Sequence, residues 1–102
     1  MKLPGNMQGM MKQAQAMQEK MQQEIAQIRV EGTAGGGMVI IKMDGQKNTL
    51  AVTIDKEVSG DVEMLQDMVL AASNDAVKKV DEQVQRKMGG MLGGLGLPPG
   101  MF

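Results

Sequence analysis

Residues 29–55 read RVEGTAGGGMVIIKMDGQKNTLAVTID, and this stretch decides the fold class. It contains three β-prone runs, at residues 29–34, 38–44 and 48–55. The runs are separated by Gly35-Gly36-Gly37 and by Asp44-Gly45, which are sequences typical of tight turns. The stretch therefore predicts three strands joined by hairpins into an antiparallel meander.

The side chains of the second and third runs indicate how this sheet is covered. Leu50, Val52 and Ile54 alternate with small or polar residues, so one face of the third strand is apolar and must be covered. Residues 38–41, MVII, are apolar on both faces. That pattern predicts a strand that is buried on two sides or lies at a subunit contact, and it favours a dimer.

The segments on either side of the sheet have the periodicity of helices. Between residues 7 and 28 apolar side chains recur every three or four positions, which predicts a helix over 6–28. Ser59-Gly60-Asp61 supplies capping residues for a second helix over 61–88, with Gly89-Gly90 as its predicted stop. The predicted fold class is α+β (α-β-β-β-α), with one domain at 1–88 and a flexible Gly/Pro-rich tail at 89–102.

Composition excludes several classes of function. The 102 residues include no cysteine and no histidine, so the usual nucleophiles, transition-metal ligands and general bases near neutral pH are missing. We therefore expect no enzyme activity, no cofactor, no metal and no small-molecule substrate. No apolar run reaches the length of a signal peptide or a membrane span, which predicts a soluble, cytoplasmic protein with no membrane partner.

Several short motifs, taken in order, resemble one known family. They are MKQAQAMQEKM at 11–21, Ile54-Asp55, MLQD at 64–67, NDA at 74–76 and LPPG at 97–100. With the element order, they resemble the YbaB/EbfC family of bacterial nucleoid-associated proteins. The resemblance implies a tweezer-like homodimer whose sheets join at the centre and whose long helices project as arms. It also implies that the dimer binds DNA and alters its conformation, with effects on nucleoid organisation and gene expression.

Charge is unevenly distributed, although the net charge is only −1. In the second half of the second predicted helix, basic residues outnumber Asp81 and Glu82. A cationic end on each arm of a dimer would clamp backbone phosphates. The predicted DNA-binding residues are Lys12, Lys20, Lys78, Lys79, Arg86 and Lys87.

Two other interpretations compete with this clamp. Asp75 with Lys79, and Glu82 with Arg86, have the spacing of ordinary i,i+4 pairs on a solvated helix face. The 13 methionines also suit an adaptor that holds another protein on Met-rich helical arms. Because the strands carry no aromatic residue for stacking unpaired bases, double-stranded DNA is the expected nucleic acid.

Overall fold

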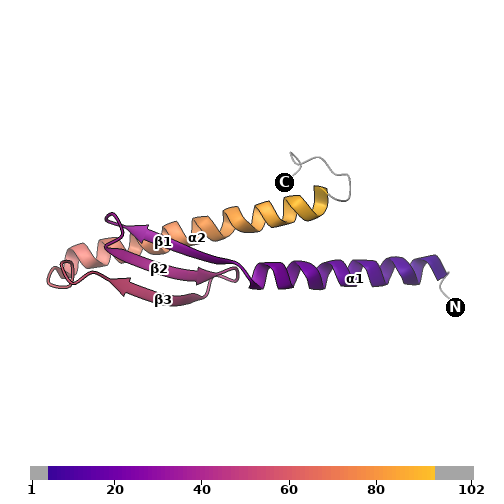
Figure 1. Ribbon diagram of the computed structural model, residues 1–102, viewed down its shortest axis with the longest axis horizontal. Helices are drawn as coiled ribbons and strands as arrows, with labels where there is room; N and C mark the ends of the chain where they lie inside the picture. The colour runs from indigo at the N-terminus through magenta and orange to yellow at the C-terminus, as the bar shows by residue number, and fades with distance from the viewer. Residues whose placement is uncertain (1–4, 94–102) are drawn as a thin grey trace.

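The computed structural model describes residues 5–93 of the chain, and the side chains of residues 7–90. Its elements run α1, β1, β2, β3, α2, which confirms the predicted α-β-β-β-α order (Figure 1). The bounds are α1 Gly5–Ala26, β1 Arg29–Ala34, β2 Val39–Asp44, β3 Thr49–Ile54 and α2 Val62–Gly93. Every predicted strand is therefore present, with ends within one residue of the prediction.

The three strands form the predicted antiparallel meander, with β2 between β1 and β3. Gly32 lies opposite Ile41, and Ile41 in turn lies opposite Val52, while the β2–β3 register shifts between Lys42 and Met43. Residues 35–37 connect β1 to β2 with φ angles of 62°, 68° and 97°. Glycine adopts this left-handed backbone without a steric penalty, which explains the run of three glycines.

Helix α2 lies across one face of the sheet and forms the core against β1 and β2. Its small residues Ala72 and Ala76 are fully buried there. A Cβ on Gly32 of β1 would collide with the Ala72 carbonyl oxygen and the Ala76 amide nitrogen. The missing side chain therefore lets the helix backbone approach the strand backbone. The buried core comprises Ile28, Val30, Val39, Ile41, Met43, Ala72, Ala76 and Val80.

Strand β3 receives no comparable cover from α2. Val52 and Ile54 lie opposite the buried residues Ile41 and Val39, so they face the same side of the sheet as the core. They nevertheless remain 49% and 40% exposed. Ile40, on the opposite face of β2, is half-buried. The described part of the chain thus leaves uncovered the apolar face that the sequence predicted would need a cover.

The helix ends differ from the predicted ones. Asp61 caps α2 as predicted, because its Oδ1 accepts a hydrogen bond from the Met64 amide at 3.1 Å. The predicted stop at Gly89-Gly90 is wrong, since α2 continues to Gly93 and neither glycine takes a left-handed backbone. Helix α1 begins at Gly5 and ends at Ala26, two residues before its predicted end. The remainder of the predicted tail, 94–102, lies outside the described residues.

We expect Gly32→Ala to destabilise the fold, because the added methyl group meets backbone atoms of α2 that cannot rotate away. Overpacking of this kind typically costs about 1–3 kcal/mol of unfolding free energy. Urea unfolding followed by circular dichroism measures the loss. Gly60→Ala is the matched control, since a Cβ at that position meets nothing within 4 Å. Equal stability of Gly32→Ala and the wild type would contradict the close contact.

Candidate functional site

Two helical arms project from the same end of the sheet (Figure 1). One arm is α1 and the other is the part of α2 that follows Val84, which still packs against the core, and the two helices contact each other. On α1 the half-buried side chains are Met17, Met21, Glu24 and Ile25, all in its C-terminal half. Met10, nearer the N-terminus, is 66% exposed. Only the half of α1 next to the sheet is therefore packed against the rest of the described chain.

An ion pair joins the two arms. The Lys87 ammonium group lies 2.9 Å from Glu24 Oε2, and both side chains are about one-third exposed. The hydrogen bond from Lys87 and its positive charge lower the pKa of Glu24, and the nearby charge of Lys20 adds to the effect. Lys87 thus holds the arms together as well as contributing positive charge.

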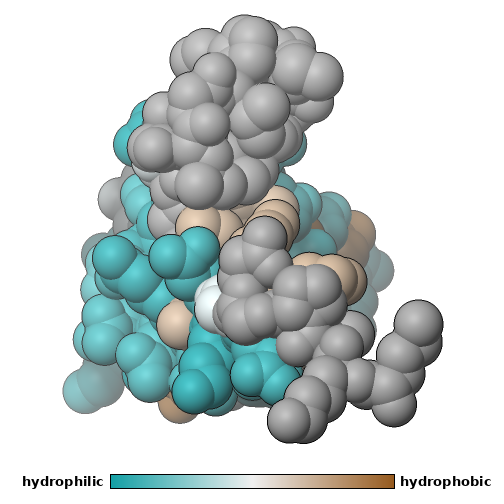
Figure 2. All heavy atoms as spheres, turned by 90° about the vertical axis from the view of Figure 1, so that its right-hand side faces the viewer, coloured by the Kyte–Doolittle hydropathy of each residue, from teal (hydrophilic) through white to brown (hydrophobic). Residues whose placement is uncertain are grey.

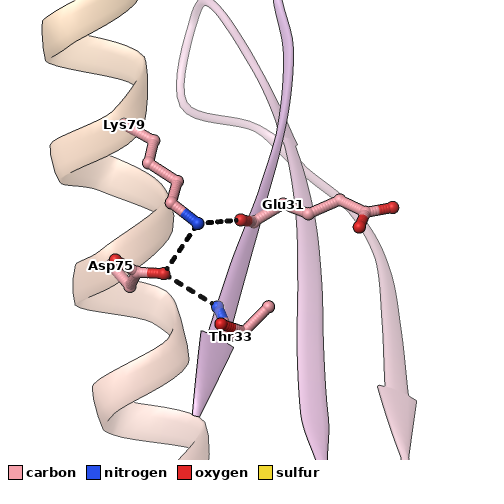
Figure 3. Close-up of polar contacts among 4 residues, drawn as sticks. All are labelled: Glu31, Thr33, Asp75 and Lys79. Atoms are coloured by element: carbon pink, nitrogen blue, oxygen red, sulfur yellow. Dashed lines mark hydrogen bonds and ion pairs between the residues drawn. The ribbon is translucent and has the colours of Figure 1, made fainter. Parts of the chain in front are cut away.

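Lys79 is bonded at the edge of the sheet, although its side chain is 42% exposed (Figure 3). Its Nζ lies 3.1 Å from Asp75 Oδ2 and donates a 2.8 Å hydrogen bond to the Glu31 carbonyl oxygen. Asp75 Oδ2 also accepts a 2.9 Å hydrogen bond from the Thr33 amide. The Thr33 amide and then Lys79 lower the pKa of Asp75, so its carboxylate is ionised at neutral pH. The predicted i,i+4 pair of Asp75 and Lys79 is confirmed.

The other four predicted DNA-binding residues are free of such partners. Lys12, Lys20, Lys78 and Arg86 are exposed, and within residues 5–93 none of them has a carboxylate within 4.0 Å. The predicted Glu82–Arg86 pair is therefore wrong. Seen along the arms, the surface outside the grey atoms is largely hydrophilic (Figure 2). These four cations are available to an external anion.

Sequence reasoning missed the partners that lie far apart along the chain. Lys87 and Glu24 are separated by 63 positions, and Lys79 reaches a carbonyl 48 positions away. Lys47 also pairs with Asp81 of α2, at 3.0 Å. No local spacing signals these contacts, because they depend on where α2 crosses the sheet. Counting basic and acidic residues along one helix therefore overestimated how many cations lack a partner.

The unpaired cations are the charged groups that this site offers to a ligand. Among the described residues no group of carboxylates is placed to hold a metal ion, and no helix there is long and apolar enough to cross a membrane. Four exposed cations are spread over two projecting helices, which is a geometry suited to an extended polyanion rather than to a small ligand.

Comparison with known proteins matches nearly the whole chain to one family. A model of the YbaB/EbfC DNA-binding family matches residues 2–95. A nucleoid-associated protein of Koribacter versatilis is 50% identical over 95 residues, covering 91% of this chain and 94% of its own. A nucleoid-associated protein of Acidobacterium capsulatum is 47% identical over 106 aligned positions, covering 97% and 98%.

A solved structure has the same fold. The crystal structure of an uncharacterized protein from Helicobacter pylori superposes with a TM-score of 0.73 at 22% identity. The match covers 89% of this chain and 99% of the other. The elements described above therefore recur, in the same arrangement, in a chain of quite different sequence.

The Glu24–Lys87 pair predicts a pH dependence of the contact between the arms. Because the pKa of Glu24 is lowered in the folded chain, the pair stabilises the folded arms above the unfolded-state pKa. That stabilisation is lost as the pH falls through the lowered value. We expect the NMR titration midpoint of the Glu24 carboxyl to rise in Lys87→Gln. An unchanged midpoint would show that the pair does not form in solution.

Proposed function

This chain belongs to the YbaB/EbfC DNA-binding family, and from that membership we propose that it is a nucleoid-associated protein that binds duplex DNA as a homodimer and alters DNA conformation. The observation that supports the mode of binding is the set of exposed, unpaired cations on two projecting helices. The proposal assigns no chemical reaction to the protein. Its place of action is the cytoplasmic nucleoid, with consequences for nucleoid organisation and gene expression.

Phosphate contact in this proposal falls first on Lys12, Lys20, Lys78 and Arg86. Their charges have no carboxylate partner within the described residues, so a phosphate can neutralise them without breaking an ion pair. Each phosphate neutralised on duplex DNA releases condensed counterions, which favours binding at low salt. Contacts from lysine and arginine side chains to phosphate oxygens carry no direct sequence information. We therefore expect little sequence preference.

Lys79 and Lys87 have a different part in the proposal. A phosphate that recruited either ammonium group would compete with Asp75 or with Glu24. Their positive charge still adds to the field around the arms. Their ion pairs also link α2 to the edge of the sheet and α1 to α2.

We propose strand β3 as the contact between the two subunits. It is an edge strand, and its apolar side chains Leu50, Val52 and Ile54 are 40–49% exposed. An edge strand of this kind is a template for pairing with another strand. Pairing with a second copy would satisfy the open peptide groups of β3 and cover this row of apolar side chains. Within one subunit the row stays exposed, because the core is small and contains no aromatic residue. The sheets would then meet at the centre of the dimer.

The adaptor function remains the second candidate, because one observation favours it. Met7, Met10 and Met11 are 46–66% exposed on the outer half of α1. Flexible, polarizable methionines are common at surfaces that bind varied protein partners. Salt separates the two functions, since capture by apolar contacts persists at high ionic strength, whereas phosphate binding weakens.

The phosphate clamp predicts that Lys78→Glu combined with Arg86→Glu weakens binding to duplexes of random sequence. We expect the affinity at low salt to fall roughly tenfold or more. The slope of log affinity against log salt should drop by about one for each phosphate that is no longer neutralised. Fluorescence anisotropy across a salt series measures both quantities.

Lys56→Glu is the control for this experiment. It changes net charge as much as either single substitution, but it lies at the end of the sheet opposite the arms. Loss of binding in Lys56→Glu equal to that in Arg86→Glu would point to bulk charge rather than to the arms. Binding that withstands both the double substitution and high salt would favour the adaptor.

The proposed subunit contact predicts that Val52→Lys converts the dimer to a monomer, because the ammonium group would have to be buried in the apolar row. Light scattering coupled to size exclusion measures the mass. Thr53→Lys is the matched control, since Thr53 lies opposite the half-buried Ile40 and faces the other side of the sheet. A Val52→Lys protein with the mass of the wild-type dimer would exclude this contact.

A further inference from the structure

The two edges of the sheet are treated differently by the rest of the chain. Strands β1 and β3 both lie at an edge and both have six residues. In an edge strand every second residue directs its N–H and C=O groups away from the sheet, where they invite another strand. Some of the outward N–H and C=O groups of β1 have hydrogen-bond partners in the described chain, whereas those of β3 have none there.

On β1 the outward groups belong to Glu31 and Thr33, and α2 supplies their partners (Figure 3). The Thr33 amide donates to Asp75 Oδ2 at 2.9 Å, and the Glu31 carbonyl accepts from Lys79 Nζ at 2.8 Å. The two capping atoms, Asp75 Oδ2 and Lys79 Nζ, lie 3.1 Å apart and engage the Thr33 amide and the Glu31 carbonyl. An acceptor and a donor from α2 thus engage an outward N–H and an outward C=O to which a neighbouring strand would otherwise bond.

On β3 the outward groups belong to Val52 and Ile54. The Asp55 amide donates to the Met38 carbonyl, so alternate residues Asp55, Thr53 and Ala51 face β2 and the residues between them face outward. Within residues 5–93 no side chain forms a hydrogen bond to the peptide groups of β3. This edge is open in its backbone as well as apolar in its side chains.

We propose that Asp75 and Lys79 act as a strand-mimicking cap that blocks β-strand addition at β1 and so confines self-association to β3. The partner excluded is a second copy of this chain, whose open β3 edge would otherwise pair with β1. A β1–β3 contact is heterologous, because it joins two different surfaces. Each added copy would leave another free β3 or β1 edge, so the assembly would keep growing. With β1 capped, only a β3–β3 contact remains, which closes at two chains. Closure at two chains rests on the dimer proposed above, whereas the cap on β1 does not.

The test removes the cap and measures mass. The full chain carrying Asp75→Ala and Lys79→Ala is compared with the wild type by sedimentation velocity at rising protein concentration. We expect the wild type to stay at one mass and the variant to form a series of heavier species. Adding Thr33→Pro should return the variant to the wild-type mass. Proline removes the outward N–H at position 33 and leaves the β1–β2 ladder intact, as prolines at sheet edges do.

The matched control is Lys47→Ala with Asp81→Ala. This change also removes one ion pair to α2, at 3.0 Å, without altering net charge or touching β1. It should leave the mass unchanged. Heavier species in the control, or in the uncapped variant despite Thr33→Pro, would overturn the proposal by showing that loss of an ion pair, rather than an open β1 edge, causes association.

A second readout covers a variant that loses its fold. Amide hydrogen exchange at Thr33 should be slow in the wild type and at least about tenfold faster in Asp75→Asn, which weakens the acceptor while keeping the shape of the side chain. Equal exchange at Thr33 in the two proteins would overturn the cap. A wild type that is monomeric would refute the proposed β3 dimer alone, because Thr33-dependent association of the uncapped variant would still reveal the cap.

Discussion

The rest of the structure depends on the contact between Gly32 of β1 and the backbone of α2 at Ala72 and Ala76. Because no side chain separates them, α2 lies directly over β1 and β2 and gives β3 no comparable cover. That single placement sets the position of Asp75 and Lys79 at the β1 edge. It also leaves Val52 and its neighbours bare, and directs the second half of α2 beyond the sheet. The packing of the core, the open β3 edge and the projection of α2 therefore all follow from the close approach of α2 to Gly32.

The electrostatic character of the chain follows from the same placement. A protein with a net charge of −1 binds a polyanion only if its positive charges are segregated. Of the six basic residues on α1 and α2, Lys79 and Lys87 are paired with Asp75 and Glu24, and four are left unpaired among the described residues. The pairs fix the helices and the free cations face solvent. The proposed DNA contacts therefore fall on cations that take no part in the pairs: Lys12 and Lys20 of α1, and Lys78 and Arg86 of α2.

Most of the fold could be predicted from the sequence, because its determinants are local. The glycine turn at 35–37, the alternation in residues 49–54 and the cap at Asp61 each act over a few residues. The end of α2 could not be predicted, since two glycines stop a helix only when one adopts a left-handed backbone. The free and bound lysines were indistinguishable for a related reason. Whether Lys87 meets Glu24 depends on the crossing of two helices, and no local pattern encodes that crossing.

The attachment of α1 has a mechanical consequence. Its inner half is joined to the body by the ion pair of Glu24 and by the half-buried side chains around Ile25, while the exposed turns around Met10 extend outward. A helix attached only at its base acts as a lever. A tilt of about 10° at the base would displace the tip of a 22-residue helix by roughly 6 Å. The position of the outer turns is therefore set by the contacts that the inner half makes around Glu24 and Ile25.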